Sequence, residues 1–330
     1  MRIFSFIKSA KYRNNKAAYY VIGYIRYWSP KFYFRKRLHK ELSKINKVTE
    51  KEYILDRVNY YNKLSQTVPL NTEVTTPLSK FKLGKKGKSP FGFKVYFFDA
   101  IKYTRYFSNK LRAAFLFGDV THVPDYPTII KSRPIHGNNE NSVVLNMESI
   151  RHFQFINDPI RFEDKSNRLI GRGAVTQPHR IRFYEKYFGH PMCDLGQINH
   201  NNTDHPEWNV PKMALVDHLE YKFILCLEGY DVASNLKWVM SSNSLAVMPR
   251  PTYETWYMEG KLIPDYHYVA IKDDYSDLEE RMNYYIQHPD KANEIIRHAH
   301  EYIEQFKNKK REKLISLLVL KKYFEKTGQL

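Results

Sequence analysis

Beyond about residue 93 the chain alternates short apolar runs with turns, and this pattern predicts a parallel α/β fold. The runs have three to six residues. Several of these runs end in turns that contain glycine. A helical pattern follows the run at 168–170 and continues to about residue 184, and another follows the run at 222–227 and begins at about residue 235. A repeated order of strand, glycine turn and helix is typical of parallel β-α units. The predicted strands are 94–98, 114–117, 168–170, 222–227, 245–248 and 267–271.

Helical patterns occupy both ends of the chain. Residues 8–62 are rich in lysine and contain a single glycine, Gly23. A stretch rich in threonine, proline, serine and glycine follows at 66–92 and predicts a loop. Further on, Ser276 and Glu279 have the spacing of a capping box and predict the start of a helix. The helices expected from there are 276–287, 290–306 and 307–326.

Composition favours a globular protein of two domains. The chain has 330 residues, of which 42% are hydrophobic, and this is too much for a disordered chain. At ~150 residues per domain the length predicts two domains. No apolar stretch approaches the ~20 residues of a membrane span, and the run at 3–7 is too short for a secretory leader, so we expect a cytoplasmic protein. Two cysteines, Cys193 and Cys226, exclude a disulfide scaffold and a cysteine-built zinc cluster.

The net charge of +18 is concentrated at the two ends of the chain. Residues 1–48 hold thirteen Lys/Arg and one acid, residues 307–326 hold eight Lys/Arg and two acids, and the charges balance elsewhere. Basic segments attract nucleic acid or anionic membranes. In 1–48 the charges alternate with aromatic residues, which suit the lipid headgroup region. We therefore favour a peripheral membrane role; the alternatives are aromatic side chains packed on the body, and nucleic-acid binding.

Two junctions between a strand and a helix are candidate phosphate sites. The motif Gly171-Arg172-Gly173 lies at one of them, where helix N–H groups favour anions and an arginine adds a bidentate donor. Taken alone, such a motif is more often only a turn. Gly229 lies at the other junction, where Ser234 is expected to cap the next helix and Lys237 lies in its first turn. A lysine there opposes the helix dipole unless an anion is bound. The pair of junctions favours a nucleotide diphosphate ligand.

Acidic residues supply one candidate base and no convincing metal site. Asp119 follows the predicted strand 114–117, where open α/β sheets place their sites, so it is a candidate general base. The alternative is an aspartate that only forms a turn. Asp273, Asp274 and Asp277 are better explained as acids at a helix start than as metal ligands. The thirteen histidines show no zinc spacing supported by a carboxylate.

Several stretches together resemble a known family. They are YKFILCLEGYDVASNLKWVMSSNSLAVMP (221–249), YETWYMEGKLIPDYHYVAI (253–271) and DYSDLEERMNYY (274–285). Upstream lie DKSNRLIGRGAVTQPHR (164–180) and an acidic loop, FGDVTHVPDYP (117–127). All of them resemble glycosyltransferase family 90, which includes bacterial lipopolysaccharide core transferases and eukaryotic protein O-glucosyltransferases. The resemblance covers roughly residues 115–305.

The resemblance implies an α/β fold of GT-B type, in which two Rossmann-like domains face a cleft. The charge and helical patterns add basic helical segments at both ends of the chain, which the resemblance does not cover. It implies an inverting transfer that requires neither a metal nor another cofactor. The expected parts are a basic, aromatic-rich helical segment and loop at 1–90, an acceptor-side domain at 91–158, a donor domain at 159–306 and a basic C-terminal helix at 307–330.

The resemblance also implies roles for individual residues. The catalytic base is an aspartate of the acidic loop, which we place at Asp119, with Asp125 as the second choice. Many eukaryotic relatives have an arginine at the position of Asn235, so another cation must supply the main charge to the diphosphate. The expected donor-site residues are Arg172, Gly173, Arg180, Gly229, Ser234, Asn235, Lys237 and Glu254.

The sequence thus predicts an inverting glycosyltransferase that uses a nucleotide-sugar donor, with a UDP-sugar as first choice. Its expected acceptor is a lipid-linked, anionic oligosaccharide of the lipopolysaccharide or lipooligosaccharide core, at the cytoplasmic face of the inner membrane. The anionic membrane surface is an expected partner and nucleic acid is not. The alternatives are a transferase for capsule polysaccharide or protein serine, a basic nucleic-acid-binding protein without catalysis, and a family member without activity.

Overall fold

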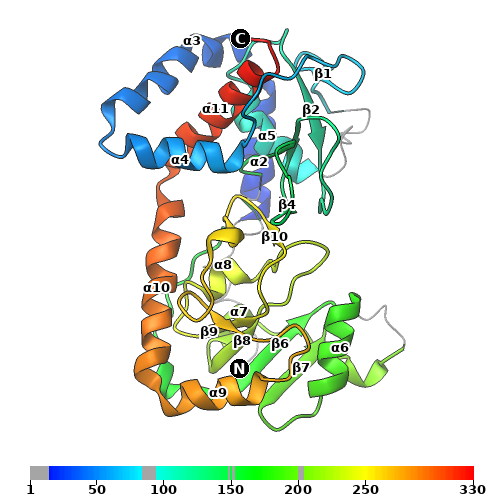
Figure 1. The fold of residues 1–330 in the computed structure, drawn as a ribbon, viewed down its shortest axis with the longest axis vertical. Coiled ribbons are helices and arrows are strands. Elements are labelled where there is room, and N and C mark those ends of the chain that lie inside the picture. The colour runs from blue at the N-terminus through cyan, green and yellow to red at the C-terminus, as the bar shows by residue number, and fades with distance from the viewer. Residues whose placement is uncertain (1–14, 84–93, 148, 151–152, 200–203) are drawn as a thin grey trace. The chain divides into compact units, whose positions relative to one another are not determined.

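The computed structural model describes residues 15–83, 94–147, 149–150, 153–199 and 204–330. The chain forms two compact units, each a mixture of helices and strands (Figure 1). Of the described residues, unit 1 takes those within Arg151–Pro251 and Gly260–Gln305, and unit 2 takes those within Asn15–Ile150, Thr252–Glu259 and Phe306–Leu330. The α/β class expected from the sequence is confirmed. The predicted N-terminal apolar run at 3–7 lies outside the described residues.

Unit 1 is built on a five-stranded parallel sheet with the strand order β11-β9-β8-β6-β7. The first strand along the chain, β6, lies inside the sheet, with β7 on one side and β8 on the other. This is the order of a doubly wound α/β sheet. The strands are β6 (Ser166–Gly173), β7 (Cys193–Gln197), β8 (Tyr221–Leu225), β9 (Leu245–Met248) and β11 (Val269–Ala270).

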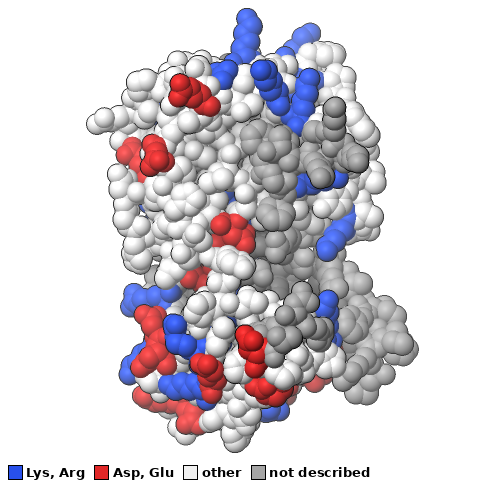
Figure 2. Space-filling view, turned by 90° about the vertical axis from the view of Figure 1, so that its right-hand side faces the viewer, with Lys and Arg blue, Asp and Glu red and all other residues white. Residues whose placement is uncertain are grey.

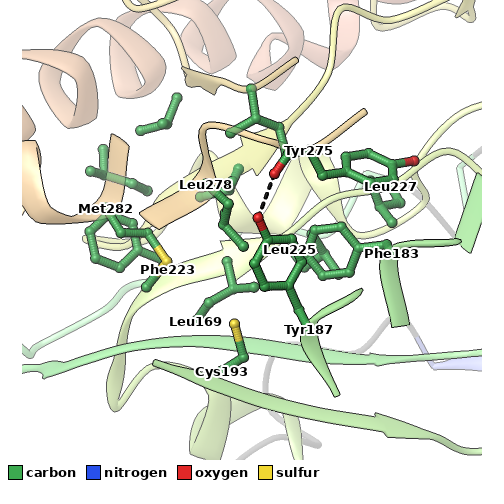
Figure 3. Packing of buried hydrophobic residues seen from close by; sticks show 14 of the residues in the cluster. Leu169, Phe183, Tyr187, Cys193, Phe223, Leu225, Leu227, Tyr275, Leu278 and Met282 are labelled. Carbon is green, nitrogen blue, oxygen red and sulfur yellow. Dashed lines mark hydrogen bonds between the residues drawn. The ribbon is translucent and has the colours of Figure 1, made fainter. Parts of the chain in front are cut away.

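An apolar core joins one face of this sheet to the helices α6 and α9 (Figure 3). The sheet contributes residues such as Leu169 and Phe223, and the helices contribute Phe183 and Met282. Tyr187 donates from its hydroxyl to a backbone carbonyl in this core, so its polar atom is satisfied. The helices of unit 1 are α6 (Pro178–Tyr187), α7 (Leu215–His218), α8 (Leu236–Val239), α9 (Leu278–Gln287) and α10 (Pro289–Lys307), with 3₁₀ turns at Phe162–Asp164, Pro206–Trp208 and Glu259–Lys261.

Unit 2 has a smaller sheet with the order β1-β2-β3-β5. The strands β2, β3 and β5 are parallel, and β1 is antiparallel at the edge. A separate antiparallel pair joins β4 to β10, so the segment Thr252–Glu259 belongs to this unit. The strands are β1 (Thr76–Pro77), β2 (Arg112–Leu116), β3 (Thr128–Ile130), β4 (Arg133–Pro134), β5 (Ser142–Val144) and β10 (Tyr253–Glu254).

The last helix of the chain is a core element of unit 2. Most of its apolar side chains are buried, including Leu317, Leu320 and Tyr323. Its Glu312 forms a buried ion pair with Arg57 at 2.5 Å. The basic C-terminal segment therefore packs on the body of unit 2 through its apolar side. The helices are α2 (Lys16–Trp28), α3 (Lys31–Leu42), α4 (Lys51–Tyr61), α5 (Lys94–Thr104) and α11 (Lys309–Lys326), with a 3₁₀ turn at Ser43–Lys47.

Most of the predicted strands and helices exist, but the strand predicted at 94–98 is wrong. These residues begin the helix α5. The run has the aromatic and β-branched residues that favour strands locally, yet nearly every side chain of α5 is buried. Burial on several sides of a helix removes the amphipathic spacing that would have marked it as one.

Three further local predictions are corrected at strand and helix ends. Gly171-Arg172-Gly173 continues the strand β6 and is not a turn. A Cβ atom at Gly171 would lie 2.7 Å from a Leu195 methyl group, so this glycine serves close packing. The helix after 235 is a single turn, and Ser234 does not cap it. The helix α9 starts from Asp277, not from a capping box at Ser276.

Charge is distributed differently over the two units. On the face drawn in Figure 2, acidic and basic side chains alternate over unit 1, whereas lysines and arginines gather toward one end of unit 2. Among the described helices, none combines the length and apolar character that crossing a membrane requires.

Candidate active site

Three of the predicted donor residues, Gly173, Arg180 and Gly229, lie together at the carboxyl edge of the sheet in unit 1. β6 ends at Gly173 and the neighbouring strand β8 ends at Leu225. The chain leaves β6 for β7 on one side of the neighbouring pair β6 and β8, and it leaves β8 for β9 on the other side. In open α/β sheets, ligands bind outside the carboxyl ends of the strands at such a switch point.

Arg180 connects these two strand ends. Its Nε and one terminal nitrogen donate to the carbonyl oxygens of Glu228 and Leu227, each at 2.7 Å, and the other donates to Ala174 at 2.8 Å. A Cβ atom added at Gly173 or at Gly229 would lie 3.5 or 3.7 Å from this guanidinium. The structure therefore brings Gly173, Arg180 and Gly229 together.

The surroundings of Arg180 make it a charge held in a fixed place. The three carbonyls take three of the five N–H groups of its guanidinium. Burial lowers the pKa of Arg180, although an arginine remains protonated. It belongs to the first turn of α6, whose first residue is Pro178. Proline at this position fixes the helix start, because its missing N–H is not needed there.

Arg172 lies on the opposite face of β6 from Gly171, because alternate residues of a strand point to opposite faces. Its terminal nitrogens donate to the carbonyl oxygen and to the carboxylate of Asp194, at 2.6 and 2.5 Å. The hydroxyl of Tyr221 donates to the other carboxylate oxygen at 2.5 Å. Burial opposes ionisation of Asp194, but hydrogen bonds from Tyr221 and Arg172 together with the charge of Arg172 lower its pKa overall. Arg172 is thus already neutralised by a carboxylate of its own unit.

A cavity of about 240 Å³ lies on this second face of the sheet. Arg172 from β6 and His218 from α7 line it, together with Asn235 and Trp238 at α8. His218 is half-buried, and desolvation lowers its pKa, so the ring is neutral near pH 7. The cavity combines apolar walls with a few fixed polar groups, as small-molecule sites do.

The other candidates near α8 have different environments. Asn235 donates from its side-chain amide to the carbonyl of Leu225 at 2.9 Å, and so ties the start of α8 to the end of β8. Ser234 is exposed. Lys237 lies in the single turn of α8, as expected, and its side chain is fully buried. Burial raises the pKa of the nearby Cys226 thiol, and the charge of Lys237 lowers it in part.

In unit 2, Asp119 lies just beyond the carboxyl end of β2 and forms an ion pair. Nζ of Lys131, the residue after β3, lies 2.5 Å from its Oδ1. The lysine side chain is 1% exposed and the aspartate side chain 36% exposed. A buried ammonium therefore holds a carboxylate that solvent or a substrate can reach. This geometry goes beyond a turn-forming aspartate, because its partner is a charge on the next strand.

The backbone around Asp119 is fixed by its neighbours. The N–H of Val120 donates to Oγ of Ser132 at 3.0 Å, and this hydroxyl lies 3.3 Å from the Val120 carbonyl. Gly118 has a φ of +122°, which glycine adopts without strain. Asp125 is an exposed residue further along the same loop. Between the two candidate bases, Asp119 has the more defined position.

Glu254 belongs to unit 2, whereas the other donor candidates belong to unit 1. Nε of Arg133 donates to one of its oxygens at 2.7 Å, and the hydroxyl of Tyr60 donates to the other. Glu254 is 2% exposed and Arg133 is fully buried. Burial and the charge of Glu254 raise the pKa of Tyr60, so this hydroxyl stays protonated. Both carboxylate oxygens are engaged within unit 2, and this favours a structural role for Glu254.

Within the described ranges, no group of three His, Cys, Asp or Glu residues is arranged to hold a metal ion. The aspartates at the start of α9 serve the backbone instead. Oδ1 of Asp274 accepts from the N–H of Ser276 at 3.0 Å, and Oδ1 of Asp277 accepts from the N–H of Lys272 at 2.9 Å.

Sequence reasoning missed the partners that hold these candidates. Lys131 and Ser132 directly follow the apolar strand Thr128–Ile130, and a polar pair after a buried strand is a signal that could have found them. Asp194 has no such signal, because it lies inside the strand β7. Its role depends on the register that pairs Ile170 of β6 with it.

Comparisons with known proteins agree with the resemblance seen in the sequence. The sequence model of the family described as "Glycosyl transferase family 90" matches residues 158–324. The O-glucosyltransferase LpsA of Dichelobacter nodosus is 44% identical over 271 residues, which cover 82% of this chain and 82% of that protein. Human protein O-glucosyltransferase 3 is 27% identical over 139 residues, which cover 41% of this chain and 27% of that protein.

Proposed function

Because the chain belongs to glycosyltransferase family 90 and is a glycosyltransferase, we propose that it moves a sugar from a UDP-sugar to a lipid-linked, anionic oligosaccharide of lipopolysaccharide core type. The similar protein from Dichelobacter nodosus is named an O-glucosyltransferase, so UDP-glucose is the first donor to test. The proposal includes a GT-B arrangement, which the presence of two α/β units with parallel sheets supports.

The observation that carries the donor assignment is the position of Arg180 between Gly173 and Gly229. We propose that the diphosphate lies at this switch point, against the guanidinium and the N–H groups of the glycine-containing strand ends. Arg180 is favoured over Arg172 as the main cation, because Asp194 already neutralises Arg172. It is favoured over Lys237, because Lys237 is fully buried. Asn235 and Ser234 lie beside this edge and remain candidates for contacts to the donor.

The proposed chemistry is a single displacement with Asp119 as the base. A hydroxyl of the acceptor attacks the anomeric carbon and Asp119 accepts its proton. The bond from that carbon to the diphosphate oxygen breaks, and UDP leaves with the electron pair. The configuration at the anomeric carbon is inverted. General base catalysis of this type contributes roughly 10²–10⁴ in rate. Asp125 remains the second choice for this role.

Charge on the leaving diphosphate is met by Arg180 and the surrounding N–H groups in this proposal, so no metal ion is required. Positioned donors that meet developing charge contribute about 3 kcal/mol each. The acceptor is proposed at the cytoplasmic face of the inner membrane. A protein serine is the second candidate acceptor, because the weaker match is to a human protein O-glucosyltransferase.

A thermal-shift screen tests the donor assignment. UDP, GDP, CMP and their common sugar conjugates are added to the full chain with and without EDTA. We expect UDP and one UDP-sugar to raise Tm by several degrees at ~100 times Kd, because binding to the folded state adds about 2.7 kcal/mol there. EDTA should leave this shift unchanged. If none of the nucleotides raises Tm, or if EDTA abolishes the rise in Tm, the donor assignment is contradicted.

A further inference from the structure

The helix α2 of unit 2 has two apolar faces, and one of them packs on α5. A Cβ atom at Gly23 would lie 2.8 Å from the ring of Phe98, so glycine lets the two helices come close. The rings of Tyr20 and Tyr27 contact Phe98 and Phe97, with centroids 6.0 and 5.9 Å apart. This face holds α2 on the body of unit 2, where both helices lie side by side (Figure 1).

The other face of α2 exposes apolar side chains to solvent. Val21, Ile25 and Trp28 have the spacing i, i+4, i+7 and so form one stripe along the helix. They are 58%, 59% and 72% exposed. Phe32 and Tyr33 extend the apolar surface onto α3, at 61% and 48% exposure. We call these five residues the docking face. Large apolar side chains that are exposed together on two consecutive helices mark a candidate interaction site.

Positive charge surrounds the docking face without acidic compensation nearby in sequence. Residues 15–40 contain seven Lys/Arg and no acid. The exposed Lys36 and Arg37 lie over the rings of Phe32 and Tyr33, at 5.9 and 4.5 Å from the ring centroids.

A second group of cations lies where α2 ends and α3 begins, and there Nη1 of Arg105 donates to the backbone carbonyl of Arg26 at 3.2 Å. Burial lowers the pKa of Lys31, and the charges of Arg35, Lys82 and Arg105 lower it further. Burial likewise lowers the pKa of Arg105 to about 10, with a contribution from Arg26. Like charges that lie close together contribute to both shifts after burial, and an anionic partner would relieve their repulsion.

We propose that the docking face of α2 and α3 binds the surface of an anionic lipid bilayer. Val21, Ile25 and Trp28 enter the boundary between headgroups and acyl chains, and Lys36, Arg37 and their neighbours contact the headgroup phosphates. A bilayer accommodates both the apolar side chains and the surrounding cations, because its acyl chains lie directly beneath anionic headgroups. A second copy of the chain would oppose the same positive charges, and a nucleic acid would leave the aliphatic stripe in water. Only the role of this membrane binding, which is to bring the enzyme to a lipid-linked acceptor, rests on the proposed function.

The test measures binding of the full chain to vesicles of phosphatidylcholine alone and of phosphatidylcholine mixed with phosphatidylglycerol. We expect binding to the anionic vesicles that falls as salt rises. The triple variant V21Q/I25Q/W28Q should bind at least ~30-fold more weakly, and K36Q/K40Q ~10-fold or more. The matched controls are L55Q/V74Q, which changes exposed apolar residues elsewhere in unit 2, and K212Q/K291Q, which removes two exposed lysines of unit 1. Both controls should bind like the unchanged protein.

Tryptophan fluorescence gives a second readout that does not depend on the multiple variants. Trp28 is 72% exposed, whereas Trp208 and Trp256 are buried and Trp238 is half-buried. Anionic vesicles should therefore shift the emission to shorter wavelength, and the conservative W28F should lose most of this shift while it still binds.

Three results would overturn the proposal: equal binding to neutral and anionic vesicles, no binding to either, or unchanged binding of both V21Q/I25Q/W28Q and K36Q/K40Q. Self-association or RNA binding that is lost in V21Q/I25Q/W28Q, without vesicle binding, would assign the surface to those partners instead. Transfer to a soluble oligosaccharide acceptor is measured in parallel, and the docking-face variants should retain it. Absence of transfer in every protein would count against the proposed function and leave the vesicle result standing.

Discussion

Lys131 Nζ lies 2.5 Å from Asp119 Oδ1, and this ion pair links the ends of the neighbouring strands β2 and β3 in unit 2. The lysine is buried and the aspartate is partly exposed. Lys131 also lies near the ring of Tyr96, at 5.6 Å from its centroid. Its position is therefore set by the body of the unit, and through it the position of the carboxylate. In the proposed mechanism Lys131 is a positioning residue for the base.

The variant K131M should lower kcat by ~10–100-fold, because a misplaced base loses the alignment that the reaction requires. KM for the UDP-sugar should stay within ~2-fold, since the donor is assigned to unit 1. K131R should recover part of the loss, because it restores a cation at the same place. Steady-state kinetics on the three proteins checks this. A rise in donor KM that accounts for the whole effect would contradict a positioning role.

The variant R180K should raise Kd for UDP by ~10–100-fold. A lysine keeps the charge but cannot donate to three carbonyls in the fixed geometry of a guanidinium. R182K is the matched control, because Arg182 is exposed on the same helix α6. Calorimetric titration with UDP compares the two. Equal Kd values for UDP in R180K and R182K would contradict the assignment of Arg180 to the donor site.

Unit 1 should lose stability in acid through His267. The N–H of Ile263 donates to Nδ1 of His267 at 2.9 Å, so this nitrogen carries no proton in the folded state. Burial, together with the charge of His298, lowers the pKa of His267 to about 4. The unfolded chain takes up this proton near pH 6.5 and the folded chain near pH 4, so Tm should fall as pH drops between these values.

The variant H267N tests that assignment, because the amide oxygen can accept the same hydrogen bond and does not titrate. Its Tm should depend less on pH between 6.5 and 4 than the Tm of the unchanged protein. Identical pH profiles of the two proteins would assign the acid sensitivity to other groups.

A buried network around Glu312 should dominate the stability of unit 2. Glu312 pairs with Arg57 and also accepts from the indole of Trp256 at 2.6 Å. The variant E312L leaves the buried Arg57 without its carboxylate and should cost roughly 3–5 kcal/mol of unfolding free energy. E301L is the control, because Glu301 pairs with Arg297 on the exposed side of α10 and should cost about 0–1 kcal/mol. Urea denaturation measures both, and equal costs would contradict this account.

Much of the fold could be predicted from the sequence where one local signal determines an element. The strand 245–248 and the helix after 276 have clear apolar runs or acidic starts, and the structure has β9 and α9 there. The strand predicted at 94–98 is wrong because helix α5 is buried on several sides and therefore lacks an amphipathic pattern. A single sequence does not reveal which elements surround a segment.

The sequence indicated which candidate residues lie near one another better than it indicated which other side chains hold them. Gly173, Arg180 and Gly229 do come together, as strand ends followed by helices suggest. Whether a cation is available to a ligand depends on partners from other strands, such as Asp194 for Arg172. Such pairings follow from sheet register, and the spacing of residues along one chain does not specify it.

In the proposed mechanism the protein transfers a sugar with inversion and uses Asp119 as the base. The most direct test incubates the full chain with UDP-glucose, an α-linked donor, and a core oligosaccharide acceptor in the presence of EDTA, and determines the anomeric configuration of the product. The account predicts a β-linked product, with turnover reduced by ~10²–10⁴ in D119N and binding of UDP retained. An α-linked product, or full turnover by D119N, would contradict it.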